Sequence, residues 1–200
     1  MKMRRSGREG FSLVELMIAL AVASILAIVA APGFRDMLRR NKVSGASNAL
    51  LADIAYARSE AASRGGIVSI CPSSDGLSCV TDGTAYEGGW LVYTYSPGNG
   101  VANTTYDSTK PTTNILLRSN GARDGVSIQA LDKVILSFGS QGQTLRSDTA
   151  QPKFETCSRP KGQTGTGVST TVVPGAVLTV NPSGSVSSQS VGVQSSCVPT

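Results

Sequence analysis

Histidine is absent from this 200-residue chain, and aromatic residues make up only 5% of it. Histidine is the commonest general base in enzymes and the commonest metal ligand, so its absence weakens enzymatic and metal-binding interpretations alike. The sequence also has no phosphate-binding glycine loop, no nucleophile elbow and no cysteine pair with zinc-site spacing. It therefore predicts a protein that has no catalytic residues and binds no cofactor or metal.

The formal net charge of +5 is spread unevenly along the chain. Residues 1–10 carry four basic side chains and one acidic side chain, and residues 65–200 carry eight of each. The large C-terminal part is therefore neutral, which weakens the inference of an anionic partner from the basic average. The length allows one globular domain together with an anchoring segment.

Four cysteines occur, at positions 71, 79, 157 and 197. An even number of cysteines in an exported domain indicates two disulfides, and three pairings are possible. The pairing of Cys71 with Cys79 and of Cys157 with Cys197 is favoured, because each pair brackets one candidate hairpin or strand unit.

A long apolar run follows the basic N-terminus. Residues 11–34 are almost wholly apolar, and Glu15 is the only charged residue among them. This length suits one bilayer crossing, which takes about 20 residues, and the preceding basic residues place the N-terminus in the cytoplasm. A secretory signal peptide cleaved after Ala23 is the alternative, but it is disfavoured because an ordinary signal peptide has no carboxylate near the start of its apolar core.

An amphipathic helix is predicted over residues 35–64. Apolar residues recur there at steps of three and four and form one stripe, which consists of Val43, Ala46, Leu50, Ile54, Ala57 and Ala61. Ser47, Arg58 and Glu60 lie largely off this stripe, and the last two are predicted to face solvent.

Two further signals concern the course of the predicted helix, which runs from Phe11 to Arg64. Gly65 and Gly66 end it. Pro32 removes one backbone hydrogen bond and crowds the preceding turn, so a kink or local melting is predicted over residues 28–33.

From residue 65 onward, short runs of β-forming residues alternate with turn-forming residues. The runs predicted as strands are residues 67–71, 90–95, 115–118, 126–131, 134–138, 169–173 and 176–180. Residues 96–113 are predicted as a long loop, and Trp90 is predicted as a core residue. Residues 162–200 have no charge and no aromatic ring, which is typical of a linker, but their alternating valines and Cys197 favour ordered hairpins.

The most informative string is RRSGREGFSLVELMIAL, residues 4–20. It resembles the class III leader of type IV pilins and type II secretion pseudopilins, with Gly10, Phe11 and Glu15 at the characteristic positions. The resemblance implies that a prepilin peptidase cuts after Gly10 and methylates the new amine of Phe11. It also implies that Glu15 pairs with the N-terminal amine of a neighbouring subunit. The alternative for Glu15 is a carboxylate that reaches the membrane interface.

Shorter strings in the rest of the chain resemble the GspH and FimT/FimU group of minor pilins and pseudopilins. They are ARSEAASRG (57–65), VSICPSSDG (68–76), GWLV (89–92), SFGSQG (137–142) and LTVNPSG (178–184). The implied fold is the α+β pilin fold, in which a long N-terminal helix packs on an antiparallel β-sheet head. The implied parts are a leader (1–10), a helix (11–64, transmembrane over 11–34 and amphipathic over 35–64) and a periplasmic head (65–200).

The function implied by this resemblance is that of a minor pilin that primes assembly at or near the tip of a type IV pilus. Its expected partners are the prepilin peptidase, other major and minor pilins and the inner membrane, from which the subunit passes into the filament. A GspH-like pseudopilin of the type II secretion system is the alternative.

A FimT-like DNA-uptake pilin is a second, disfavoured alternative. Some FimT-type members bind DNA through a Gly-Arg-x-Arg motif, and the matching positions here are Gly184, Ser185, Val186 and Ser187. Both arginines are replaced by serine, so the cationic contacts to phosphate on which DNA affinity depends are missing. Arg159 and Lys161 are the nearby cations.

Overall fold

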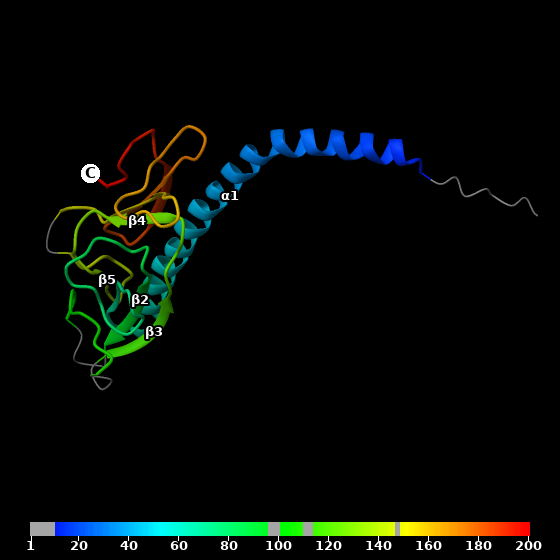
Figure 1. Cartoon of the computed structure of the whole chain (residues 1–200). Helices are drawn as coiled ribbons and strands as arrows, with labels where there is room; N and C mark the ends of the chain where they lie inside the picture. The colour runs from blue at the N-terminus through cyan, green and yellow to red at the C-terminus, as the bar shows by residue number, and fades with distance from the viewer. Residues whose placement is uncertain (1–10, 96–100, 110–113, 147–148) are drawn as a thin grey trace, which may run out of the picture. The chain divides into compact units, whose positions relative to one another are not determined.

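The computed structural model describes residues 11–95, 101–109, 114–146 and 149–200. Within these residues one helix, α1 (Leu13–Arg64), precedes eight β-strands (Figure 1). The chain divides into two compact units, Met1–Leu38 and Arg39–Thr200. The first contains the beginning of α1, and the second contains the rest of α1 and the head, residues 65–200. The predicted Gly10 site lies outside the described residues.

Local sequence explains both ends of α1. The helix begins at Leu13 and not at Phe11, because Ser12 caps it: the Ser12 Oγ atom accepts a hydrogen bond from the Glu15 N–H group. It ends at Arg64 because Gly65 takes a φ of +63°, a conformation that glycine adopts without a steric penalty. Glycine at this position therefore fixes the point at which the chain leaves the helix.

The first sheet contains β1 (Val68–Pro72), β2 (Trp90–Tyr95), β3 (Asn114–Asn120) and β5 (Leu136–Phe138). Its order is β3-β2-β1-β5, and all neighbouring strands are antiparallel. One face of this sheet packs in the main core, and the other carries a second apolar cluster that includes Leu91, Tyr93, Tyr95 and Ile135. The strands β1 and β2 are therefore covered on both sides, whereas β3 at the edge of the sheet is largely exposed.

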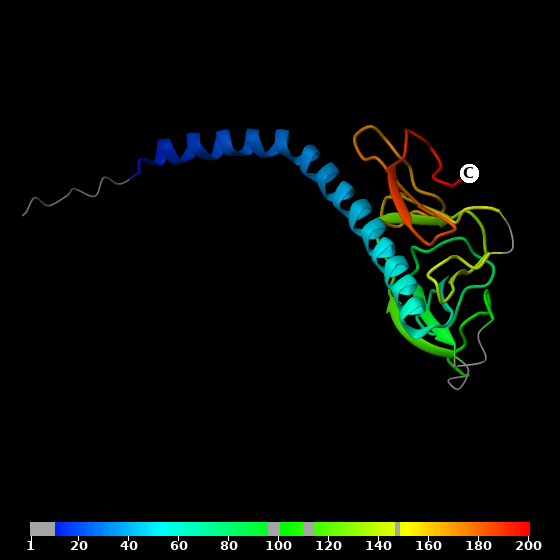
Figure 2. The same ribbon diagram turned by 180° about the vertical axis from the view of Figure 1, so that it is seen from behind.

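The second sheet contains β4 (Val126–Ala130), β6 (Lys153–Ser158), β7 (Ala176–Val180) and β8 (Val186–Ser190). Its order is β4-β6-β7-β8, again antiparallel. Figure 2 shows the orange and red segments of the chain, which include the last strands, gathered in the part of the head that also holds the C-terminus. The last strands and the chain end thus belong to a sheet of their own.

The main core joins the helix to both sheets. The predicted apolar stripe of α1 is buried throughout, and it packs against residues of sheet 1 and sheet 2. Large buried side chains of this core include those of Trp90, Tyr86, Phe138, Ile128 and Leu178. Trp90 is fully buried, which confirms its prediction as a core residue.

Two strands were not predicted from the sequence, and one predicted strand does not form. β6 carries the charged residues Lys153 and Glu155 at alternate positions, which weakens its strand signal, although Glu155 and Cys157 on the same face are buried. β8 is rich in serine and largely exposed, so its sequence carries little strand signal. Residues 169–173 form no strand, because the Thr170 hydroxyl accepts a hydrogen bond from the Val173 N–H group and closes a turn.

Candidate functional site

The start of α1 forms a capping arrangement. The Ser12 Oγ atom accepts from the Glu15 N–H group at 3.2 Å, and the Ser12 carbonyl accepts from the Leu16 N–H group at 3.1 Å. Ser12 is thus the N-cap, and Glu15 is the third residue of the helix, as in the capping box Ser-x-x-Glu. A carboxylate in the first helical turn is also favoured by the helix dipole. Glu15 therefore lies in the first turn of α1, four residues after Phe11, which precedes the helix.

The first unit exposes an apolar surface. None of residues 13–34 is buried, although most of them are apolar. Among the described residues, α1 is the one helix whose length and composition suit a membrane crossing, and the mean hydropathy of its apolar window is 2.7. An exposed apolar helix of this kind requires lipid or other helices around it.

Pro32 lies inside α1, and residues 28–33 are helical. The local melting that the sequence allowed is therefore not present. The kink at Pro32 stays a prediction.

A buried carboxylate that the sequence analysis missed joins α1 to sheet 1. Asp53 is 4% exposed, and its Oδ2 atom accepts a hydrogen bond from the Trp90 indole N–H group at 2.8 Å. Its Oδ1 atom lies 3.0 Å from the Arg118 guanidinium, and Asn120 donates a third hydrogen bond. The hydrogen bond to Asp53 also raises the pKa of the Arg118 guanidinium. The sequence held one indication that Asp53 is buried: it directly precedes Ile54, which belongs to the apolar stripe.

Other polar residues of α1 differ from their predicted environments. Ser47 is buried, although it was placed off the apolar stripe. Arg58 is half-buried, and its Nε atom donates to the Gly142 carbonyl at 3.1 Å, so the solvated environment predicted for it was wrong. Glu60 pairs with Arg64 on the helix surface.

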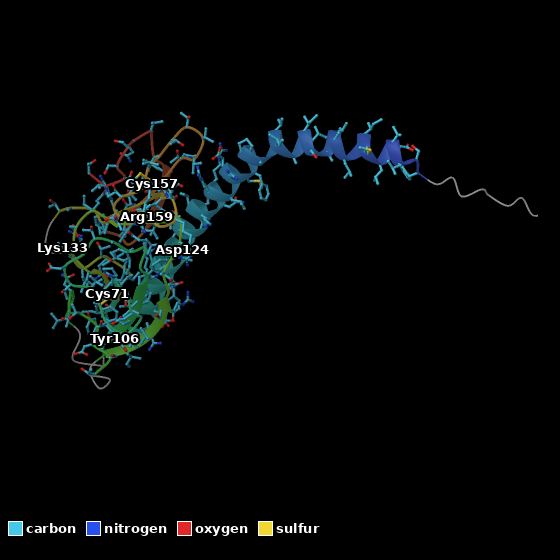
Figure 3. The ribbon with its side chains drawn as sticks, in the orientation of Figure 1. Cys71, Tyr106, Asp124, Lys133, Cys157 and Arg159 are labelled. Atoms are coloured by element: carbon cyan, nitrogen blue, oxygen red, sulfur yellow. A yellow bond between two sulfur atoms is a disulfide. The ribbon has the colours of Figure 1, made fainter. Side chains whose placement is uncertain are left out.

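The cysteines form two disulfides, Cys71–Cys79 and Cys157–Cys197, which are the pairs that the sequence favoured. Cys71 lies in sheet 1 and Cys157 in sheet 2, and Figure 3 shows them in different parts of the head. The first disulfide closes a short loop after β1. The second ties the C-terminal segment to β6, so residues 162–200 take the ordered form and include β7 and β8.

The positions that match the DNA-binding motif lie in the turn before β8 (Gly184 and Ser185) and at the start of β8 (Val186 and Ser187). Gly184 adopts a φ of +79° in this turn, and its N–H group donates to the Asn181 carbonyl at 2.8 Å. Ser185 and Ser187 are exposed and uncharged. Arg159 pairs with Glu87 at 2.8 Å, and Lys161 lies 3.6 Å from Asp124. The described part of this region therefore offers no cluster of unpaired cations to a phosphate backbone.

One group of potential metal ligands occurs among the described residues: Glu155, Cys157 and Cys197. Both sulfur atoms of this group are joined in a disulfide and do not act as thiolate ligands. Glu155 is 4% exposed, and burial raises the pKa of its carboxyl group, although Gln194 donates a hydrogen bond to it.

Comparison with known families gives two matches along this chain. The family model of the type II transport protein GspH matches residues 46–184, which is more than half of the chain. The model of the prokaryotic N-terminal methylation motif matches residues 5–31.

Individual proteins give a consistent result. Fimbrial protein EcpC of Eikenella corrodens is 32% identical over 107 residues, which are 54% of this chain and 68% of EcpC. The crystal structure of the type IV minor pilin FimU of Pseudomonas aeruginosa superposes with a TM-score of 0.50 at 20% identity. The match covers 79% of this chain and 96% of FimU. At this identity the likeness to FimU concerns the fold.

Proposed function

This chain belongs to the GspH family of minor pilins and pseudopilins, and on that premise we propose that it primes assembly at or near the tip of a type IV pilus. The observation that carries the proposal is the combination of the methylation motif with an exposed apolar helix whose second half is built into a folded head. A subunit of this design has one end suited to lipid or a helical bundle and another suited to contacts outside the membrane. We assign it no catalytic role.

The proposed mechanism is mechanical. A prepilin peptidase cuts after Gly10 at the cytoplasmic face of the inner membrane and methylates Phe11, while the head stands in the periplasm. Cleavage creates a positive amine on Phe11, four residues before Glu15. A buried acidic group in a membrane is costly unless it is paired, so Glu15 pairs with the amine of a neighbouring subunit and sets the stagger between helices. Small residues such as Ala19, Ala23 and Ala27 permit close helix packing.

Replacement of Glu15 by alanine tests this mechanism. We expect Glu15→Ala to leave the protein in the inner membrane and to remove most of it from sheared filaments, as measured by immunoblotting. Glu60→Ala is the matched control, because it removes an acidic side chain from the same helix without changing the first turn. Normal incorporation of Glu15→Ala into filaments would contradict the mechanism.

Processing is tested separately by mass spectrometry of the membrane-extracted protein. We expect an N-terminal peptide that begins at methylated Phe11. A chain that still begins at Met1, or one that begins at Ser24 after signal-peptide cleavage, would refute the leader assignment.

A pseudopilin of the type II secretion system is the second candidate, and the match to the GspH model favours it. The pilus is preferred because EcpC, which is 32% identical over 107 residues, is a fimbrial protein. Deletion of the gene distinguishes the two: loss of surface pili with normal secretion supports the pilus, and the reverse result supports the secretion system. DNA uptake remains disfavoured, and a gel-shift assay with the purified protein tests it.

A further inference from the structure

The beginning of the second unit carries a cluster of basic residues that the proposed function does not use. Arg39, Arg40 and Lys42 are exposed on α1, shortly after the apolar run that ends at residue 34. Residues 35–42 have a formal charge of +3, whereas the whole chain from residue 11 onward has a formal charge of +2. The positive charge of the processed protein is therefore concentrated in this short segment.

Two loops of the head meet these cations. The Arg40 side chain donates a hydrogen bond to the Val172 carbonyl, in the connection between β6 and β7. A Cβ atom added at Gly125 would lie 3.1 Å from the Lys42 Nζ atom, so Lys42 lies against the turn before β4. The connection between β6 and β7 thus lies at the same end of the second unit as the cations of α1.

This connection has the composition of a surface that enters a lipid interface. Residues 162–175 contain no charged residue. Val172 is 45% exposed and Val168 is 39% exposed, so both present apolar surface to solvent. Lys161 precedes the connection and its side chain is 84% exposed, although Asp124 at 3.6 Å offsets part of its charge. We call residues 39–42, Lys161 and residues 162–175 the basic face.

The covalent chain keeps the cations of α1 close to the bilayer. Arg40 follows Phe34 by six residues, so it lies at most about 20 Å from the end of the apolar run, whatever the angle between the two units. The headgroup region begins directly at the edge of the hydrocarbon core. Long basic side chains at this distance are within reach of lipid phosphates.

We propose that the basic face binds anionic phospholipid headgroups while the subunit waits in the membrane. Cations near an anionic surface are attracted to it, and exposed valines add apolar contact at the boundary with the acyl chains. The inference rests on the proposed function, because it requires α1 to span the membrane. Contact with lipid holds the head at the membrane surface, and release of this contact must accompany entry of the subunit into a filament.

Hydrogen exchange on the full chain tests the inference. The protein is placed in nanodiscs of phosphatidylcholine alone or of equal parts phosphatidylcholine and phosphatidylglycerol. We expect amides of residues 162–175 to exchange several-fold more slowly in the anionic nanodiscs and the difference to disappear at high salt. Peptides from β2, in the core of the head, serve as the folding control and exchange equally in both.

Charge-matched variants make the test specific. The double substitution of Arg40→Gln and Lys42→Gln abolishes the lipid-dependent protection. The single substitution Lys161→Gln, which leaves α1 unchanged, reduces this protection. Arg64→Gln with Lys133→Gln removes the same charge elsewhere and keeps the protection. Equal exchange of the amides of residues 162–175 in both nanodiscs overturns the inference. Lipid-dependent protection that survives in the double variant of Arg40 and Lys42 also overturns it.

A protein partner gives a different result. Protection that appears only after a second pilin subunit is added to the nanodisc assigns the basic face to contacts between subunits and also overturns the inference. A failure of lipid binding leaves cleavage after Gly10 and entry into filaments unchanged. It is therefore distinguishable from a failure of the proposed function.

Discussion

Asp53 shows how one residue determines the attachment of α1 to the head. Its carboxylate is buried and satisfied by an indole, a guanidinium and an amide donor from two strands of sheet 1. Arg118 also lies over the Tyr56 ring, 3.5 Å from its centroid, so the guanidinium contacts α1 in two ways. The position and angle of the helix on sheet 1 are therefore fixed by polar contacts as well as by apolar packing.

We predict that Asp53→Ala destabilises the protein by roughly 3 kcal/mol, because it leaves the buried indole and amide donors without an acceptor. Denaturant unfolding followed by Trp90 fluorescence measures the change. The control is Asp124→Ala, which removes a surface carboxylate whose nearest cation is 3.6 Å away and should cost at most about 0.5 kcal/mol. Equal effects of the two substitutions would contradict the prediction.

Glu155 is a second buried carboxylate, and it has the opposite effect on stability. It lies beneath the C-terminal segment, on the outer face of sheet 2, where Lys153 and the Thr200 terminus also line a cavity. Burial raises the pKa of its carboxyl group above the ordinary value of 4.5. The folded state therefore holds the proton more tightly than the unfolded state does, and stability is lost as pH rises through the raised pKa.

We predict that Glu155→Gln is more stable than the parent protein at pH 7. The difference should fall toward zero below about pH 4, where Glu155 is protonated in both the folded and the unfolded state. Thermal unfolding at a series of pH values measures it. A difference that grows as pH falls would show that Glu155 stabilises the folded protein as a carboxylate.

At the scale of elements, the two disulfides constrain loops of very different length. Cys71–Cys79 joins residues 8 positions apart, whereas Cys157–Cys197 joins residues 40 positions apart and holds the segment after β8 against β6. A cross-link that closes a longer loop removes more entropy from the unfolded chain. The GspH match ends at residue 184, so the segment held by the second disulfide lies beyond it.

We predict that replacing both Cys157 and Cys197 by alanine lowers the free energy of unfolding by about 4 kcal/mol. The same replacement at Cys71 and Cys79 should lower it by about 2.5 kcal/mol. Unfolding in guanidinium chloride measures both values. A larger loss for the Cys71 and Cys79 pair would show that local packing outweighs loop length.

Sequence predicted the elements whose signal is local and missed those that depend on tertiary contacts. The stripe from Val43 to Ala61 and the runs 90–95 and 176–180 are buried or paired as their periodicity indicates. The strand β6 was missed because Glu155 is unfavourable in a buried strand. No local pattern indicates that the C-terminal segment covers this residue. Asp53 was missed for the same reason, since its partners lie 37 to 67 residues away.

At the scale of the whole molecule, the fold separates an anchor from a self-contained unit. Among the described residues, the buried apolar side chains begin at Val43, and the second compact unit begins at Arg39. Every partner that packs against the helical stripe lies in the same unit. The apolar run before residue 35 contributes nothing to this core.

We predict that residues 35–200 fold as a soluble, cooperatively unfolding protein when they are exported to an oxidising compartment. Size-exclusion chromatography and thermal unfolding are the measurements. A matched truncation that begins at residue 51 removes Val43, Ala46 and Leu50 from the core, and it should aggregate or unfold at a much lower temperature. A stable product from this shorter chain would show that the head does not require the helix.

The burial of the helical stripe against two sheets also determines how the protein carries force. Tension applied along α1 is transmitted to the sheets by the side chains that pack against them over about five helical turns, from Val43 to Ala61. The contacts between α1 and the sheets are loaded in shear. All of them must therefore break together before the helix can separate from the head. If the head were attached only at one end of the helix, its contacts would break one after another under a much smaller force.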